Sequence, residues 1–245
     1  MHKNTRVEED IDMKLFSLAL APMFIAAFYI YIRDKYEKEP VRLLVTGLVY
    51  GAFIIVPVVR TQNLLLLFTP NSGVIAEAFF LSFAVAAFVE EFYKYIILFF
   101  LVWRNDNFNE RFDGIVYAVF ISLGFAGVEN LLYVLSPSLG GVSTALSRAV
   151  FAVPGHALFG VAMGYYFAVA KFEPRHKNKC LLLAFSVPVL LHGTYNFILM
   201  SELPYLMAIF CVFAGYLWVS GFRKMREHIE ASPFKTHSKN WEIEN

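Results

Sequence analysis

The segment Val89-Glu90-Glu91-Phe92-Tyr93-Lys94-Tyr95 places two carboxylates and one ammonium group inside a long apolar run. Residues 74–103 otherwise have the composition of a membrane-spanning helix. A charged side chain at the centre of a bilayer costs about 2.5–3.5 kcal/mol on insertion scales, so it needs a partner there. We therefore expect Glu90, Glu91 and Lys94 to pair with one another or with polar groups on other helices.

The whole chain has the composition of a polytopic membrane protein. Of its 245 residues, 58% are hydrophobic and only 17% are charged, and the mean hydropathy is +0.55. Ordinary soluble domains carry roughly 25% charged residues. The formal net charge of +1 indicates no strongly basic or acidic surface, so no nucleic-acid partner is expected. The composition predicts an all-α helical bundle whose main partner is the lipid bilayer.

Seven apolar segments are long enough to span a bilayer, which takes about 20 helical residues. They are residues 13–32, 41–60, 74–103, 113–135, 143–170, 180–200 and 204–222. We expect one integral membrane domain over residues 1–245, with a polar N-terminal tail at 1–12 and a cytoplasmic tail at 223–245. The basic residues of the N-terminal tail leave an eighth crossing or a re-entrant segment open.

Basic residues occur in every second connection between these segments. Lys and Arg lie in residues 33–42, 104–112, 171–179 and 223–245, and none lies in 61–73, 136–147 or 201–203. Because basic loops tend to stay in the cytoplasm, the pattern predicts a cytoplasmic C-terminus, an external N-terminus and a location in the cell membrane.

Four consecutive predicted spans carry polar side chains at similar depth, as counted at about 1.5 Å per residue. These side chains are Glu90, Glu91 and Lys94 on the third span, Glu129 and Asn130 on the fourth, His156 on the fifth, and His192 and Asn196 on the sixth. Lys94 can reach either preceding glutamate on the same helix. Neighbouring residues point about 100° apart on a helix, so one glutamate is expected to pair with Lys94 while the other faces the interior.

The charges of this group restrict its chemistry. Glu90, Glu91 and Glu129 against Lys94 leave two uncompensated negative charges if the histidines are neutral. Such a cluster requires either a divalent cation or protonated carboxyl groups. Both arrangements suit hydrolysis, because a metal ion acidifies bound water and a carboxylate of raised pKa is an effective general base.

Structural explanations compete with this functional hypothesis. A buried Glu–Lys pair can simply join helices, and His156 beside Pro154 can be a packing residue at a helix kink. Arg148 is expected to anchor the fifth span at the interface or to pair with Glu77. The common depth of all the acids and histidines favours a site.

Small residues on these spans also predict close helix packing. Gly124 and Gly127 precede Glu129, Gly160 and Gly164 follow His156 at intervals of four residues, and a further glycine pair lies at 47 and 51. Such spacing lets two helix backbones approach each other in a membrane.

Taken together, the motifs resemble the PrsW family of intramembrane proteases, which is related to the CAAX prenyl endopeptidase and bacteriocin-processing superfamily. The residues that carry the resemblance are Glu90-Glu91-x-x-Lys94, Phe125-x-x-x-Glu129-Asn130, His156-x-x-x-Gly160 and His192-x-x-x-Asn196. The related superfamily has Arg where this chain has Lys94 and His where it has Glu129, which is the PrsW-like variant.

The resemblance implies hydrolysis of a peptide bond within or at the edge of the bilayer. Glu90 or Glu91, with a slight preference for Glu91, would activate water, while Glu129 and His156 would help to hold that water or a metal. If a divalent metal such as zinc is present, its expected ligands are Glu91, Glu129, His156 and His192. Whether the site uses a metal or a proton is left open.

The remaining motif residues receive supporting roles from the same resemblance. His192 and Asn196 would orient the substrate carbonyl or stabilise the oxyanion, and Lys94 would fix the second glutamate through an ion pair. The implied substrate is a membrane-anchored protein, such as a single-span anti-sigma factor.

Two other functions are compatible with buried acids and histidines. A proton- or cation-coupled transporter is expected to show inverted internal repeats, and no repeat is visible in this sequence. A non-catalytic membrane scaffold is the third hypothesis.

Overall fold

All regular elements that the computed structural model describes are helices; it describes residues 2–201 and 203–235, with side chains from residue 13 onward. The elements are α1 (His2–Arg33), α2 (Val41–Phe53), α3 (Ile55–Leu66), α4 (Val74–Phe79), the π-helix η1 (Phe80–Phe88), α5 (Val89–Val102), α6 (Arg111–Val134), α7 (Val142–Val150), α8 (Ala152–Phe172), the 3-10 helix η2 (Pro174–His176), α9 (Lys177–Met200) and α10 (Pro204–Glu230). The predicted all-α fold is confirmed.

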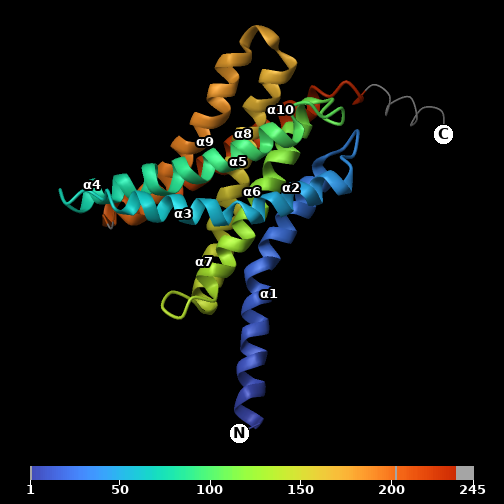
Figure 1. Cartoon of the computed structure of the whole chain (residues 1–245). Coiled ribbons are helices and arrows are strands. Elements are labelled where there is room, and N and C mark those ends of the chain that lie inside the picture. The colour runs from blue at the N-terminus through green and yellow to red at the C-terminus, as the bar shows by residue number, and fades with distance from the viewer. Residues whose placement is uncertain (1, 202, 236–245) are drawn as a thin grey trace.

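Six of the helical segments in the described part are long and apolar enough to cross a membrane. The remaining predicted span corresponds to α4, η1 and α5, which follow one another without a break. Successive connections lie on alternate sides of the bundle, with those after α1, α5 and α8 at the right and top of Figure 1 and those after α3, α6 and α9 at its left and lower left. This is the arrangement of a polytopic membrane protein.

Two helices continue beyond the predicted spans. The helical segment that contains the second span extends past residue 60, because α3 continues to Leu66. Helix α10 continues past residue 222 to Glu230, into the predicted C-terminal tail. Residues 236–245 of that tail lie outside the described part of the chain.

Two prolines coincide with breaks in the helices. Proline has no N–H for the carbonyl one turn earlier, and its ring clashes with that carbonyl. Pro57 follows the break between α2 and α3 at Ile54, and Pro154 lies in the first turn of α8, after the break at Phe151. The irregularity predicted near His156 therefore lies at Phe151, the single residue between α7 and α8.

Helix α6 lies at the centre of the bundle, and most of its length is buried. Glycines let α2 and α8 approach it closely: a Cβ atom at Gly124 would clash with the backbone of Leu48, and one at Gly164 would clash with the backbone of Gly114. Gly51 of α2 meets the Ile121 backbone in the same way. The predicted packing of the small-residue stripes is confirmed, and α6 is the shared neighbour.

Substitution of Gly124 by alanine is expected to lower the free energy of unfolding by about 1–3 kcal/mol, because α2 and α6 must separate to accept the methyl group. Denaturation of the purified protein in mixed micelles, followed by circular dichroism, measures this change. Gly215→Ala is the matched control, since a Cβ atom there meets nothing within 4 Å. Equal stability of the two variants would contradict the close α2–α6 contact.

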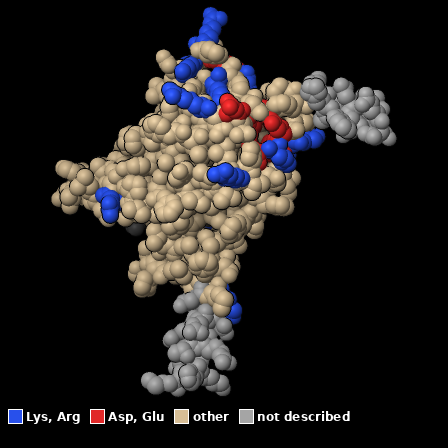
Figure 2. Space-filling model, turned by 45° about the vertical axis from the view of Figure 1, so that its right-hand side comes forward, with Lys and Arg blue, Asp and Glu red and all other residues tan. Residues whose placement is uncertain are grey.

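The charged side chains gather at one end of the molecule. In the face shown in Figure 2, Lys, Arg, Asp and Glu cluster at the top and upper right, and the rest of the surface is almost uncharged. Large apolar side chains such as Ile25, Phe100 and Val219 are exposed. A surface of this extent and composition fits contact with lipid.

Candidate active site

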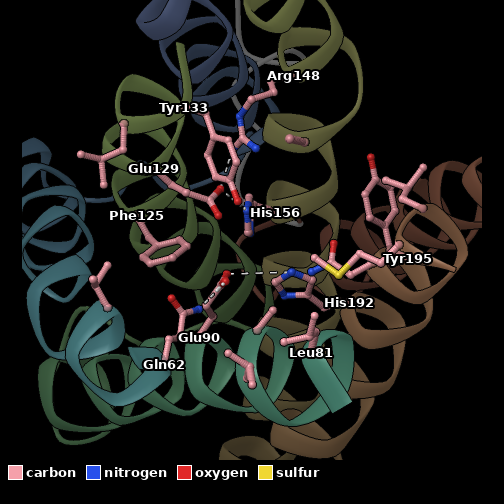
Figure 3. Close-up of a pocket in the computed structure, with 18 of the residues that line it drawn as sticks. Gln62, Leu81, Glu90, Phe125, Glu129, Tyr133, Arg148, His156, His192 and Tyr195 are labelled. Atoms are coloured by element: carbon pink, nitrogen blue, oxygen red, sulfur yellow. Dashed lines mark hydrogen bonds and ion pairs between the residues drawn. The ribbon is translucent and has the colours of Figure 1, made fainter. Parts of the chain in front are cut away.

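The buried acids and histidines of four helices converge on one pocket (Figure 3). Helix α5 begins immediately after the π-helical segment η1, and its first turn carries Glu90 and Glu91. Departures from regular α-helix of this kind are common at functional sites. One carboxylate oxygen or ring nitrogen each of Glu90, Glu91, His156 and His192 lies within 4.8 Å of the others.

Lys94 is the central cation of the group and is fully buried. Its ammonium donates hydrogen bonds to Oε1 of Glu91 at 2.7 Å and to Nδ1 of His156 at 3.0 Å, and it lies 3.7 Å from Oε2 of Glu90. It also lies 4.5 Å from the centre of the Phe125 ring. Lys94 therefore forms ion pairs with both glutamates and not with one as expected, and the shorter pair, with a hydrogen bond, is the one with Glu91.

The hydrogen bonds of His192 leave one of its nitrogens available. Nδ1 lies 2.9 Å from Oε1 of Glu91, so it carries the proton and donates to that carboxylate. Nε2 then has a free lone pair and lies 3.9 Å from Oε2 of Glu90. The ring is held by stacking on Phe159 at 4.8 Å, and the Phe83 ring packs against the neighbouring Gly193.

His156 has both nitrogens engaged. Because Nδ1 accepts from Lys94, the proton is on Nε2, which donates to Oε2 of Glu129 at 3.1 Å. The same Glu129 oxygen accepts a hydrogen bond from Nη2 of Arg148 at 2.6 Å. The chain of contacts runs from Glu91 through Lys94 and His156 to Glu129.

Arg148 is the main residue that sequence reasoning placed incorrectly. It was expected at the interface or beside Glu77, but it lies on α7 with its guanidinium against Glu129, and the Tyr133 ring lies 4.0 Å away. The Arg148 guanidinium therefore neutralises one of the two uncompensated negative charges inferred from the sequence. The single signal in the sequence was an arginine within an otherwise apolar span.

The two asparagines of the motifs lie in different surroundings. Asn130 donates to the backbone carbonyl of Ala19 on α1 at 2.6 Å and accepts from Nε of Arg148 at 2.8 Å, so it joins helices. Asn196 lies one turn after His192 and lines the pocket. Only Asn196 is placed where it can contact a substrate.

The pocket has a volume of about 540 Å³ and lies between α3, η1, α5, α6, α7, α8 and α9. Glu90, Glu129, His156 and His192 line it, whereas Glu91 and Lys94 lie behind them. Gln62 of α3 donates to Oε1 of Glu90 at 3.2 Å. Gln62 was not predicted from the sequence, because nothing in the sequence distinguishes it from the other polar residues of α3.

The unpartnered atoms of the site fit a metal ion. Oε2 of Glu90 and Oε2 of Glu91 are buried and have no hydrogen-bond partner among the described residues. Oε2 of Glu90 and Nε2 of His192, which lie 3.9 Å apart, offer one carboxylate and one imidazole donor, ligand types that zinc commonly binds. The bond from His192 to Glu91 has the form that fixes metal-binding histidines in many proteins. Glu129 is not one of these donors, since its contacts are with Arg148 and His156.

A polytopic helical bundle with acids, histidines and a pocket within its membrane-spanning region has the features of the intramembrane protease class. Residues 39–220 match the family described as PrsW family intramembrane metalloprotease. The chain is also 37% identical to Protease PrsW of Clostridioides difficile (strain 630) over 90% of this chain and 93% of the relative. It is 38% identical to Protease PrsW of Bacillus subtilis (strain 168) over 87% of this chain and 94% of the relative. No solved structure matches the chain.

These similarities show that the chain belongs to the PrsW family of intramembrane metalloproteases. It is an integral membrane protein and a protease, which confirms the first of the three functions considered from the sequence. The family description also agrees with the metal-binding character of the buried acid and histidine group.

Proposed function

We propose that this chain hydrolyses a peptide bond of a single-span membrane protein in the pocket beside Glu90. The observation that supports this most directly is that the two glutamates have different surroundings. Glu91 is fixed by Lys94 and His192, whereas Glu90 lines the pocket with an unpartnered oxygen. Glu90, and not the slightly preferred Glu91, is therefore the group proposed to act on the attacking water.

The other residues hold this arrangement in place. Glu91 orients His192, and Lys94 neutralises the negative charge of Glu91. Gln62 orients the carboxylate of Glu90. Asn196 lines the pocket one turn from His192, in reach of a bound peptide carbonyl. The Arg148–Glu129 pair closes the opposite wall and fixes the proton of His156 on the nitrogen that faces Glu129.

A divalent metal such as zinc is the proposed cofactor, with Glu90 and His192 as its ligands and with Glu91 behind His192 as the acceptor that fixes its ring. His156 belongs to the same cluster, but both of its nitrogens already have partners. A metal ion there supplies Lewis acidity, which promotes ionisation of water and polarises a carbonyl group. The proposed ligand set keeps His192 from the sequence-based one, adds Glu90, and omits Glu91, Glu129 and His156, whose facing atoms already have partners.

The substrate class follows from the walls and the mouth of the pocket. Leu81, Leu132 and Leu199 make part of the wall apolar, while Leu66 and Met200 lie at helix ends next to connections without Lys or Arg. An apolar, locally unwound segment near the end of a membrane span suits such a pocket. If the basic connections are cytoplasmic, the cut lies towards the external face, as in a single-span anti-sigma-factor-like protein.

Removal of the metal is expected to abolish cleavage of a single-span protein reconstituted with the purified enzyme. Treatment with a membrane-compatible chelator should stop fragment formation, because the site then loses the ion that promotes ionisation of water, and added Zn²⁺ should restore it. Gel analysis gives the rate, and elemental analysis of the same samples gives the metal content. Full activity in protein that contains no metal would refute the metal proposal and leave Glu90 as a general base.

A further inference from the structure

A second group of buried acids lies at the opposite end of α6 from Glu129. Asp34 follows α1, and Glu110 and Asp113 lie at the start of α6. Asp34 and Asp113 are 0% exposed and Glu110 is 2% exposed. One oxygen atom from each of the three lies within 4.8 Å of the other two.

Each carboxylate in this group has one oxygen without a hydrogen-bond partner. Oδ2 of Asp34 accepts from the backbone N–H of Glu39 at 3.0 Å, and Oδ2 of Asp113 accepts from the N–H groups of Asn109 and Glu110 at 2.9 and 2.7 Å. Their Oδ1 atoms, and Oε2 of Glu110, are buried and unpartnered among the described residues. Buried oxygens without partners are costly, so a ligand that binds them would stabilise this part of the fold.

Three cations near this group form their hydrogen bonds or ion pairs with other partners. Lys38 donates to the backbone carbonyls of Tyr31 and Asp34, Lys171 donates to the carbonyls of Trp103 and Asn105, and Arg111 pairs with Glu173 at 2.7 Å. None of the ion pairs formed by the described residues includes Asp34, Glu110 or Asp113.

Two further acids border the group. Glu37 has one buried oxygen without a described partner. Glu39 accepts a hydrogen bond from the hydroxyl of Tyr117 on α6, and burial together with the neighbouring Asp113 raises its pKa to about 10. Burial also raises the pKa of Asp34 to about 6, although Lys38 opposes this. The site therefore concentrates acids whose ionisation is costly unless a cation binds them.

We propose that Asp34, Glu110 and Asp113 bind a divalent cation with a preference for oxygen ligands, and that this ion joins the α1–α2 connection to the start of α6. Oxygen donors alone suit Mg²⁺, Mn²⁺ or Ca²⁺ rather than zinc. The ion stabilises the end of the helix that carries Glu129 at its other end, and it is separate from the catalytic group.

Mn²⁺ binding to the full-length chain in detergent tests this site. A Glu90→Gln/Glu91→Gln background removes the carboxylates of the catalytic pocket, and electron paramagnetic resonance then counts the remaining bound Mn²⁺. One tightly bound ion per chain and a higher midpoint of thermal unfolding with Mn²⁺ are expected. Asp34→Asn and Asp113→Asn should each weaken binding at least ~10-fold, because affinity depends on the number of charged ligands.

Asp106→Asn is the matched control, since Asp106 lies exposed in the neighbouring connection. It should bind Mn²⁺ and gain stability as the background protein does. Glu110→Gln provides a further variant if either aspartate change prevents folding. The proposal is overturned if the background protein binds no Mn²⁺, if binding survives all three changes, or if stability rises only on acidification and not with metal.

Discussion

The variant Glu90→Gln is expected to retain its fold and to cleave a single-span substrate about 10²–10⁴-fold more slowly than the wild type, the usual contribution of a general acid–base group. The amide matches the carboxylate in shape and can still contact Gln62, but it cannot accept a proton from water or bind a metal as an anion. Quantified fragment formation in proteoliposomes gives the ratio of rates.

Glu77→Gln provides the control for this change. Glu77 is exposed on α4, in the same predicted span as Glu90, and the substitution is chemically identical. It should leave the cleavage rate unchanged. A Glu90→Gln protein that cleaves as fast as the Glu77→Gln protein would remove Glu90 from the reaction.

Replacement of Lys94 by methionine is expected to lower the free energy of unfolding by about 3–5 kcal/mol, the range found when one partner of a buried ion pair is removed. Lys94 is fully buried, and its loss leaves Glu91 and Nδ1 of His156 without their shared donor. Denaturant titration in mixed micelles, read by tryptophan fluorescence, measures the change.

The double variant Lys94→Met/Glu91→Gln separates an ion-pair effect from a packing effect. Removal of both charges should recover a large part of the lost stability, so the two single changes should not be additive. Strict additivity would show that Lys94 and Glu91 do not interact as the structure indicates.

The membrane helices and the polar residues that meet at the pocket could be predicted, because both leave strong local signals in the sequence. Long apolar runs identify the spans, and charged groups within them are rare enough to attract attention. Glu90, Glu91, His156 and His192 were all recognised this way, and the structure brings them together. Their catalytic roles remain proposals.

Features that depend on rotation about helix axes were not predictable. Which of Glu90 and Glu91 faces the pocket depends on how α5 is turned against α6 and α9, and a change of 100° exchanges them. The Arg148–Glu129 contact depends on the break at Phe151, which turns α7 separately from α8. The acids at Asp34 and Asp113 lie far apart in the sequence, so only the tertiary fold reveals their grouping.

Mass spectrometry of the fragments from a single-span substrate, cleaved in proteoliposomes by the purified enzyme, tests the central claim most directly. The fragment masses locate the broken bond. We predict that the wild type cuts within the membrane span or at its edge and that Glu90→Gln/His192→Ala produces no fragments. Identical fragments from both proteins, or a cut only in the soluble part of the substrate, would contradict a catalytic pocket at Glu90.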